Sequence, residues 1–127
     1  MKPTYRIVIA LAAGAALGAA AIQGLQAQAK PPAYVIAAHN EIMDEAALKT
    51  FTERATPVVA SQGGRFIIRS ANPAQLTGEA PKRFAVIQFE SPEKARSWYG
   101  SAEMKPLNEI RDKAMKVRIF LVDGVSN

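Results

Sequence analysis

Few residues in this chain could do chemistry. Its 127 residues include one histidine, His39, and no cysteine. This composition excludes disulfides, zinc sites of the Cys/His type, iron–sulfur clusters and cysteine nucleophiles. Paired carboxylates at catalytic spacing, a phosphate-binding glycine loop and a Gly-x-Ser-x-Gly elbow are also missing from the sequence. We therefore predict no metal site and no cofactor.

His39 is the one residue whose ordinary titration range suits a proton shuttle near neutral pH. It stands at the end of a predicted strand, beside Asn40 and Glu41. A general base there would suit proton abstraction from a molecule bound in a pocket. The spacing indicates no Ser or Asp partner, so the simpler interpretation is a histidine that is hydrogen-bonded or faces water. Both interpretations stay open.

Five other residues are candidates for binding a small ligand: Arg111, Trp98, Tyr99, Arg65 and Tyr34. The Arg111 guanidinium could clamp a carboxylate or pair with a neighbouring acid. Trp98 and Tyr99 could line a pocket, although aromatic residues at helical spacing are more often core or dimer contacts. Arg65, together with Arg69 on the same strand, could border a polar cavity or a solvent-open edge. These residue types predict a small acidic or aromatic ligand, with a structural role as the alternative.

The first 29 residues predict a signal peptide. Lys2 and Arg6 begin the segment, the uncharged run 7–22 follows, and Ala27-Gln28-Ala29 supplies small residues for cleavage. We expect the mature chain to begin at Lys30 and to be exported, either to the periplasm or as a secreted protein. A retained anchor is the alternative. Because the run is short and rich in alanine, we favour cleavage and expect no stable membrane span after it.

The charge balance does not point to nucleic acid. The chain has 16 Lys+Arg against 11 Asp+Glu, for a net charge of +5. Removing residues 1–29 takes away two basic residues and no acidic ones, which leaves +3. The remaining basic residues alternate with acids, as in Glu93-Lys94 and Arg111-Asp112-Lys113. This pattern is typical of a solvated surface rather than a phosphate-binding stripe.

Apolar periodicity and turn residues predict one domain over residues 30–127. Its expected elements are strands at 34–39, 65–69, 83–89 and 117–122, with helices at 45–62, 92–99 and 101–114. Pro57 should kink the first helix or split off its last turn. Strict alternation in the second strand predicts Phe66 and Ile68 on one face, with Arg65 and Arg69 on the other.

The order of these elements is β-α-β-β-α-β, with the second helix in two pieces. This order predicts an α+β, ferredoxin-like fold: a four-stranded antiparallel sheet with its helices on one face. Strands 34–39, 83–89 and 117–122 are apolar at both alternating positions, so the face away from the helices also needs a cover. We expect a second copy to supply it, sheet to sheet, which gives a homodimeric α/β barrel.

Several segments together resemble a known family: Ala33-Tyr34-Val35-Ile36, Gly63-Gly64-Arg65-Phe66, Leu76-Thr77-Gly78-Glu79, Ala85-Val86-Ile87-Gln88-Phe89, Ser91-Pro92-Glu93, Ala95-Arg96-Ser97-Trp98-Tyr99-Gly100 and Leu121-Val122-Asp123-Gly124. The chain resembles the proteins catalogued as domain of unknown function 1330, in the dimeric α/β-barrel superfamily. The resemblance runs from about Ala33 to Gly124 and implies a dimer, but no established reaction. The family's common form is a short cytoplasmic protein, so the leader is a departure from it.

The wider superfamily adds an enzymatic alternative. It includes haem-degrading and cofactor-free monooxygenases that use Asn, Trp and His together, and Asn40, Trp98 and His39 are superficially similar to that set. Here the histidine is on a strand instead of a helix. Three hypotheses follow: an exported dimer that binds a small acidic or aromatic ligand, a non-catalytic structural or interaction dimer of the cell envelope, and a cofactor-free oxygenase or isomerase-like enzyme using His39.

Overall fold

The computed structural model describes residues 31–125, and Pro32–Gly124 form one compact unit. The predicted signal peptide, residues 1–29, lies outside the described residues. The elements in chain order are β1 (Ala33–Ile42), α2 (Glu45–Ser61), β2 (Arg65–Ser70), β3 (Arg83–Phe89), α3 (Pro92–Tyr99), α4 (Met104–Ala114) and β4 (Met115–Asp123). None of the helices in this part of the chain has the length and hydrophobicity that a membrane crossing requires.

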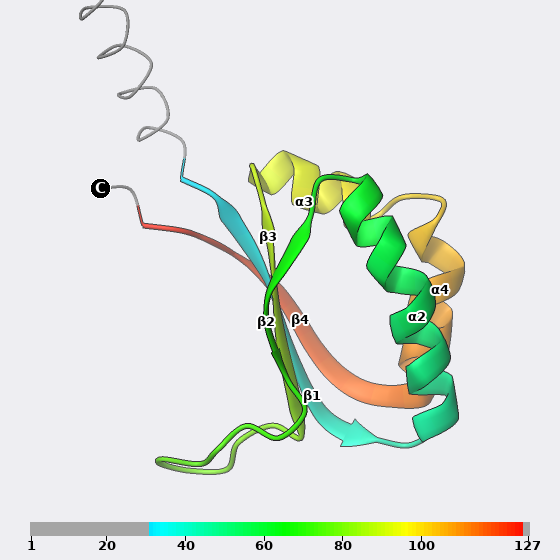
Figure 1. Ribbon diagram of the computed structural model, residues 1–127, viewed down its shortest axis with the longest axis vertical. Helices are drawn as coiled ribbons and strands as arrows, with labels where there is room; N and C mark the ends of the chain where they lie inside the picture. The colour runs from blue at the N-terminus through cyan, green and yellow to red at the C-terminus, as the bar shows by residue number, and fades with distance from the viewer. Residues whose placement is uncertain (1–30, 126–127) are drawn as a thin grey trace, which may run out of the picture. The chain divides into compact units, whose positions relative to one another are not determined.

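The four strands form one sheet in the order β2-β3-β1-β4, and every neighbouring pair is antiparallel. All three helices lie on the same face of this sheet, and the opposite face is bare (Figure 1). The predicted ferredoxin-like α+β fold, with its second helix divided into α3 and α4, is therefore confirmed. The β2–β3 connection projects away from the helices (Figure 1).

Local hydrogen bonds explain where the helices begin. The Asp44 carboxylate accepts from the backbone N–H of Ala47 at 3.0 Å and caps α2. Ser91 caps α3 in the same way, accepting from the N–H of Lys94. Pro57 was expected to kink α2 or to split off its last turn, and the split does not occur, because the helix continues without a break to Ser61. Tertiary packing of buried side chains before and after the proline holds the two parts together.

Apolar side chains from the sheet and from all three helices form the core. Its largest cluster joins buried residues of β1, α2, β3, α3 and α4: Val35, Ala55, Val59, Ile87, Phe89, Ala95, Trp98, Met104 and Leu107. The Phe89 and Trp98 rings pack with their centroids 5.3 Å apart. A smaller cluster of Leu48, Ala114 and Met115 ties α2 to the junction of α4 and β4. The helices are thereby held against one face of the sheet.

An irregularity in β2 changes which of its side chains face the helices. Phe66 pairs with Ile87, whereas Ile68 pairs with Val86, so the register shifts between the two β2 residues. Ile87 and Val86 are neighbours on β3 and point to opposite faces, so Phe66 and Ile68 do too. The prediction that Phe66 and Ile68 share a face, with Arg65 and Arg69 on the other, is therefore wrong. Phe66 and Arg69 point toward the helices.

The bare face of the sheet is apolar along a row that crosses all four strands. Cross-strand pairing places Ile68, Val86, Ile36 and Phe120 side by side in this row. Ile68 is 45% exposed and Phe120 47% exposed. Ile87 and Ile119 belong to the other face, where both line the cavity described below.

Candidate functional site

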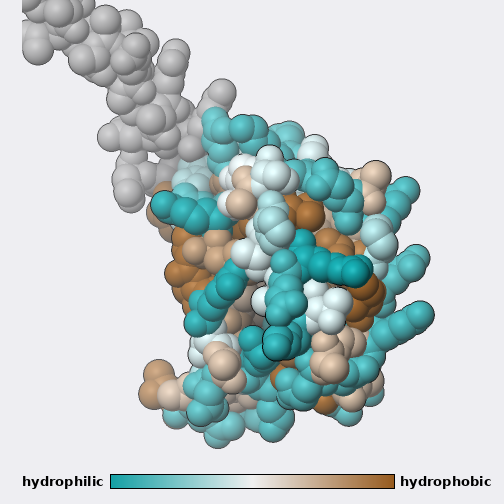
Figure 2. All heavy atoms as spheres, turned by 45° about the vertical axis from the view of Figure 1, so that its right-hand side comes forward, coloured by the Kyte–Doolittle hydropathy of each residue, from teal (hydrophilic) through white to brown (hydrophobic). Residues whose placement is uncertain are grey.

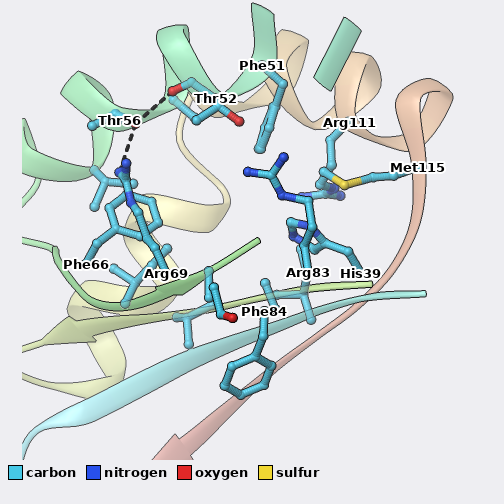
Figure 3. A pocket seen from close by; sticks show the side chains of 18 of the residues that line it. His39, Phe51, Thr52, Thr56, Phe66, Arg69, Arg83, Phe84, Arg111 and Met115 are labelled. Atoms are coloured by element: carbon cyan, nitrogen blue, oxygen red, sulfur yellow. Dashed lines mark hydrogen bonds between the residues drawn. The ribbon is translucent and has the colours of Figure 1, made fainter. Parts of the chain in front are cut away.

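A cavity of about 240 Å³ lies between the sheet and the helices. Its floor consists of residues of all four strands, and its walls come mainly from α2, with contributions from α3 and α4. Figure 3 shows the cavity with α2 on one side and the strands on the other. On the surface seen in Figure 2, hydrophilic side chains cross the middle of the face, with hydrophobic ones on both sides.

The cavity has a polar end and an apolar end. The strand register shows this, because His39 lies opposite Arg83 whereas Val35, four residues away on β1, lies opposite Ile87. The side chains at the His39 end include Arg83 and Arg111, and those at the Val35 end include Phe66, Ile87 and Trp98, whereas Arg69 stacks over Phe66. Among the described residues that line the cavity there is no Asp or Glu. An anionic group with an apolar body matches this distribution.

Arg83, at the start of β3, is the least engaged of the three arginines. Its side chain points toward the middle of the cavity, whereas that of Phe84 points to the opposite face of the sheet (Figure 3). Arg83 is half-buried, and within residues 31–125 its guanidinium has no hydrogen-bond or ion-pair partner. All five of its N–H donors are therefore available for a ligand.

Arg69 approaches from the edge strand β2. Its guanidinium stacks over the Phe66 ring at 3.8 Å from the centroid, and its Nη2 donates to the Thr56 hydroxyl on α2 at 3.1 Å (Figure 3). The Thr56 hydroxyl in turn donates to the carbonyl of Thr52 at 2.7 Å. These contacts hold Arg69 between the edge of the sheet and α2 while leaving most of its donors unused.

Arg111 lines the cavity, but protein groups already occupy most of its donors. It is only 6% exposed. Its Nε and Nη2 donate to the Asp112 carboxylate at 3.2 and 3.0 Å. Nη1 donates to Asn108 at 2.8 Å, and Nη2 also donates to the Tyr99 hydroxyl at 3.3 Å. One of its five N–H groups remains, so these contacts assign Arg111 mainly to structure.

His39 lies in the cavity among these cations. Burial, the Arg83 charge and the Arg111 charge together lower the pKa of His39 from 6.5 to about 4, so the imidazole is neutral at neutral pH. Its Nδ1 is buried and has no hydrogen-bond partner among the described residues. A neutral imidazole can accept a proton, but one with so low a pKa is a weak base.

The remaining predicted ligand residues are divided between two faces. Trp98 lines the cavity, and its Nε1 is buried without a partner in the described chain. Tyr99 does not line it, but positions Arg111 through its hydroxyl. Tyr34 and Arg65 each lie opposite Gln88 in the register, on the bare face of the sheet. Arg65 donates to the Gln88 side chain at 3.1 Å. Tyr34 and Arg65 therefore take no part in the cavity.

A second hollow lies beside the cavity, against the edge strand β4. Trp98 forms a wall of both, and Tyr99, Arg96 and Phe120 line only the second hollow. The long loop 71–82 lines the cavity only through Ala71. Within the part of the chain that the structure describes, no group of three His, Asp or Glu side chains is arranged to hold a metal ion.

Arg83 was not among the predicted binding residues, and Arg69 was considered only together with Arg65, as a residue that could border a polar cavity or a solvent-open edge. Arg83 could have been found, because Arg83, Ala85, Ile87 and Phe89 alternate along one strand and the last three are core-forming residues. The direction of the Arg69 side chain could not be predicted, because the register shift in β2 reverses it. Both arginines reach the cavity from strands on the side of the sheet away from β4.

The chain belongs to the family described as a domain of unknown function, DUF1330, whose model matches residues 32–125. No curated protein matches the chain. Among solved structures, a protein of unknown function from Rhodopseudomonas palustris is similar at 13% identity and a TM-score of 0.64, covering 81% of this chain and 92% of that chain.

Two further solved structures share the fold. The cofactor-independent oxygenase SnoaB from Streptomyces nogalater is similar at 10% identity and a TM-score of 0.55, covering 76% of this chain and 96% of that one. A dimeric ferredoxin-like protein of unknown function from Thermobifida fusca is similar at 9% identity and a TM-score of 0.54, covering 74% of this chain and 92% of that one. At these low sequence identities, the likeness establishes the fold alone.

Proposed function

We propose that this protein binds a small organic anion with an apolar body in the cavity between its sheet and helices. The observation that carries the proposal is Arg83, a half-buried cation that points into the cavity and has no partner among the described residues. A buried charge without a partner is costly, so a ligand that supplies the opposite charge is favoured.

The orientation of the ligand follows from the two ends of the cavity. Its anionic group lies at Arg83, whose N–H donors are free. Its apolar part extends toward Val35 and Ile87, with the Arg69 guanidinium stacked over Phe66 beside that end. Trp98 closes that end and provides a surface for an aromatic ring. A carboxylate with a ring or a short apolar chain fits both ends.

Binding of benzoate and short-chain carboxylates, each compared with its uncharged amide, tests this proposal. We expect the acids to bind and the amides not to bind, in isothermal titration calorimetry at pH 7. Arg83→Gln should weaken acid binding by about 10- to 100-fold, because a charge-assisted hydrogen bond is worth about 1.5 to 3 kcal/mol. Arg65→Gln is the matched control, since Arg65 lies on the other face of the sheet. Equal affinities in the two variants, or no acid binding to the wild type, would favour a non-catalytic structural or interaction protein of the cell envelope.

We also propose that two copies associate through the bare face of the sheet. The apolar row formed by Ile68, Val86, Ile36 and Phe120 supports this assembly. Partial exposure of Ile68 and Phe120 leaves apolar area that a second sheet would remove from water. Solved proteins of the same fold from Thermobifida fusca and Bacteroides fragilis are described as dimeric.

One substitution on the bare face and one in the projecting loop distinguish this assembly from a monomer. Phe120→Asp should halve the mass in light scattering at micromolar concentration, because an unpaired carboxylate in an apolar interface costs several kcal/mol. Leu76→Asp is the control, since Leu76 is also apolar and 97% exposed but lies in the projecting loop. A wild-type mass equal to one chain would contradict the proposal. Substitutions at Ile87 or Ile119 would not test this association, because both side chains face the cavity and not the bare face of the sheet.

We propose that the protein is exported and cleaved before Lys30. The basic start, the uncharged run 7–22 and Ala27-Gln28-Ala29 support this location. Intact-mass measurement of protein recovered outside the cytoplasm should give a chain that begins at Lys30. A full-length species found only in the membrane pellet would indicate a retained anchor instead.

A second candidate function is cofactor-free oxygenation or isomerisation with His39 as the base. The observation that favours it is a neutral imidazole lining the same cavity, and SnoaB, which has the same fold, is a cofactor-independent oxygenase. Oxygen consumption with a panel of phenols and hydroquinones tests it. Activity in the wild type that His39→Gln abolishes would support an enzyme, whereas no consumption with any of them would leave the binding function.

A further inference from the structure

The charges around His39 have one sign. Arg83 on β3 is its direct cross-strand partner, and directly opposite residues in antiparallel strands have Cα atoms about 4.5 to 5.5 Å apart. Arg111 faces it from α4, and Arg69 lines the same cavity from β2. The lining residues of α2, α3 and β4 carry no charge.

The nearby carboxylates are already paired or lie outside the cavity. On its own strand, Glu41 pairs with Lys116 at 3.4 Å, and Asp112 pairs with Arg111 at 3.0 Å while 66% of its side chain is exposed. Glu45 and Glu53 of α2 line a neighbouring hollow, and Arg83 and Thr52 line both that hollow and the cavity. Lys82, which donates its backbone N–H to the His39 carbonyl at 2.8 Å, is exposed. None of these acids lines the cavity with His39.

An anion in this cavity would therefore be the one negative group that shares it with His39. Nearby positive charges disfavour a proton on imidazole, and a negative charge at the same distance favours it. The anion placed at Arg83 would offset the arginine charges and attract a proton to the ring. Because the effective dielectric constant of a half-buried cavity is lower than that of the surface, the effect is larger than it would be on the surface.

We propose that His39 takes up a proton when an anion occupies the cavity, so that the site binds its ligand more tightly in acid than at neutral pH. This inference rests on the proposed anion site and adds its regulation. Proton uptake and binding then assist each other by the same factor, since linkage between two sites is reciprocal. The site would retain its ligand in an acidified environment and release it as the pH rises.

The size of the effect follows from the two protonation equilibria. The pKa of His39 is about 4 without the anion. Burial, the largest cause of this low pKa, remains when an anion binds, so a full return to the ordinary value near 6.5 is the upper bound, at which affinity at pH 5 exceeds affinity at pH 8 by about 30-fold. Binding at pH 5 then takes up about 0.9 proton, and binding at pH 8 takes up almost none.

Benzenesulfonate is a suitable probe because it is aromatic and remains a monoanion throughout this pH range. Calorimetric titration of the full protein at pH 5 and pH 8, in pairs of buffers with different ionisation enthalpies, gives both the affinity and the number of protons taken up. His39→Gln keeps a polar neutral side chain that does not titrate. We expect the variant to bind with the same affinity at both pH values and with no proton uptake.

The outcomes separate this inference from the function on which it rests. Wild-type binding at pH 5 and pH 8 with equal affinity and no proton uptake would overturn the role of His39 and leave the anion site standing. The same pH dependence in His39→Gln as in the wild type would also overturn it. No binding of benzenesulfonate at either pH would contradict the anion site itself, and the inference with it.

Discussion

His39 and Arg83 lie directly opposite each other on the neighbouring strands β1 and β3, and both line the same cavity. The two side chains would carry like charges if the histidine were protonated. Burial and the charges of Arg83 and Arg111 lower the pKa of His39 to about 4. The protonation of His39 is therefore linked both to the state of the site and to the free energy of unfolding.

Without a ligand, stability should fall in acid because of His39. Above pH 6.5 the imidazole is neutral in both the folded and the unfolded chain, so it costs nothing. Between pH 6.5 and 4 the unfolded chain binds the proton and the folded chain does not, so the free energy of unfolding falls as the pH falls. The shift is worth up to about 3 kcal/mol, which solvent screening of a half-buried group reduces to about 2.

Urea unfolding at pH 7, 5 and 4 measures this contribution when the wild type is compared with His39→Gln. The stability of the wild type should fall relative to the variant by about 2 kcal/mol between pH 7 and pH 4. Parallel pH profiles for the two proteins would show that neither burial nor the charges of Arg83 and Arg111 lower the pKa of His39 in the folded chain.

Arg111→Ala should destabilise the fold by about 2 to 4 kcal/mol. The change leaves the Tyr99 hydroxyl and the Asn108 side chain without their donor, and it opens space at a buried position. Asp112→Asn is the control and should cost about 1 kcal/mol or less, because Asp112 is exposed. Urea denaturation measures both. If Arg111→Ala is as stable as the wild type but binds no anion, Arg111 is a ligand clamp after all.

Gly64→Ala should lower stability by about 1 to 3 kcal/mol through overpacking. A Cβ at this position would lie 2.7 Å from Cζ of Phe89 and 2.8 Å from Cγ1 of Val59, both of which are fully buried. Gly100→Ala is the matched control, since the nearest atom to its Cβ is 3.5 Å away, and it should change stability by about 0.5 kcal/mol at most. Thermal unfolding compares the two. Equal melting temperatures would mean that the core yields to the added methyl group.

Pro57→Ala should stabilise the protein by about 1 to 3 kcal/mol. Proline inside α2 removes a backbone donor and strains the preceding turn. Its side chain is exposed, so little packing is lost when it is replaced. Ala60→Gly, in the same exposed part of the helix, should instead lower stability by about 1 kcal/mol. A lower melting temperature for Pro57→Ala would show that the packing of α2 depends on the proline.

The element order could be predicted because its causes are local. Asp44 and Ser91 cap the helices that follow them through bonds to residues only three positions away. Period-two and period-3.6 apolar patterns then assign strands and helices without knowledge of their neighbours. The same locality explains the error at Pro57, where packing between distant residues outweighs a local preference.

The candidate site could be predicted only in part. His39, Arg111 and Trp98 do line one cavity, since each belongs to an inward-facing position of a regular element. Arg65 and Tyr34 lie on the other face. Arg69 was assigned to the wrong face because a register shift reverses side-chain direction over a few residues, and alternation alone does not reveal such a shift.

The amino-acid sequence by itself determined the fold class, the starts of α2 and α3 and the absence of thiol chemistry, because these depend on residue type and on neighbours along the chain. The tertiary structure alone decided which arginine is free. Arg111 and Arg83 have the same guanidinium, but Arg111 meets Asn108, Asp112 and Tyr99, whereas Arg83 meets no partner within residues 31–125. The hydrogen-bond partners of a side chain depend on its position in space. Which guanidinium keeps free N–H donors for a ligand is therefore decided only when strands and helices pack together.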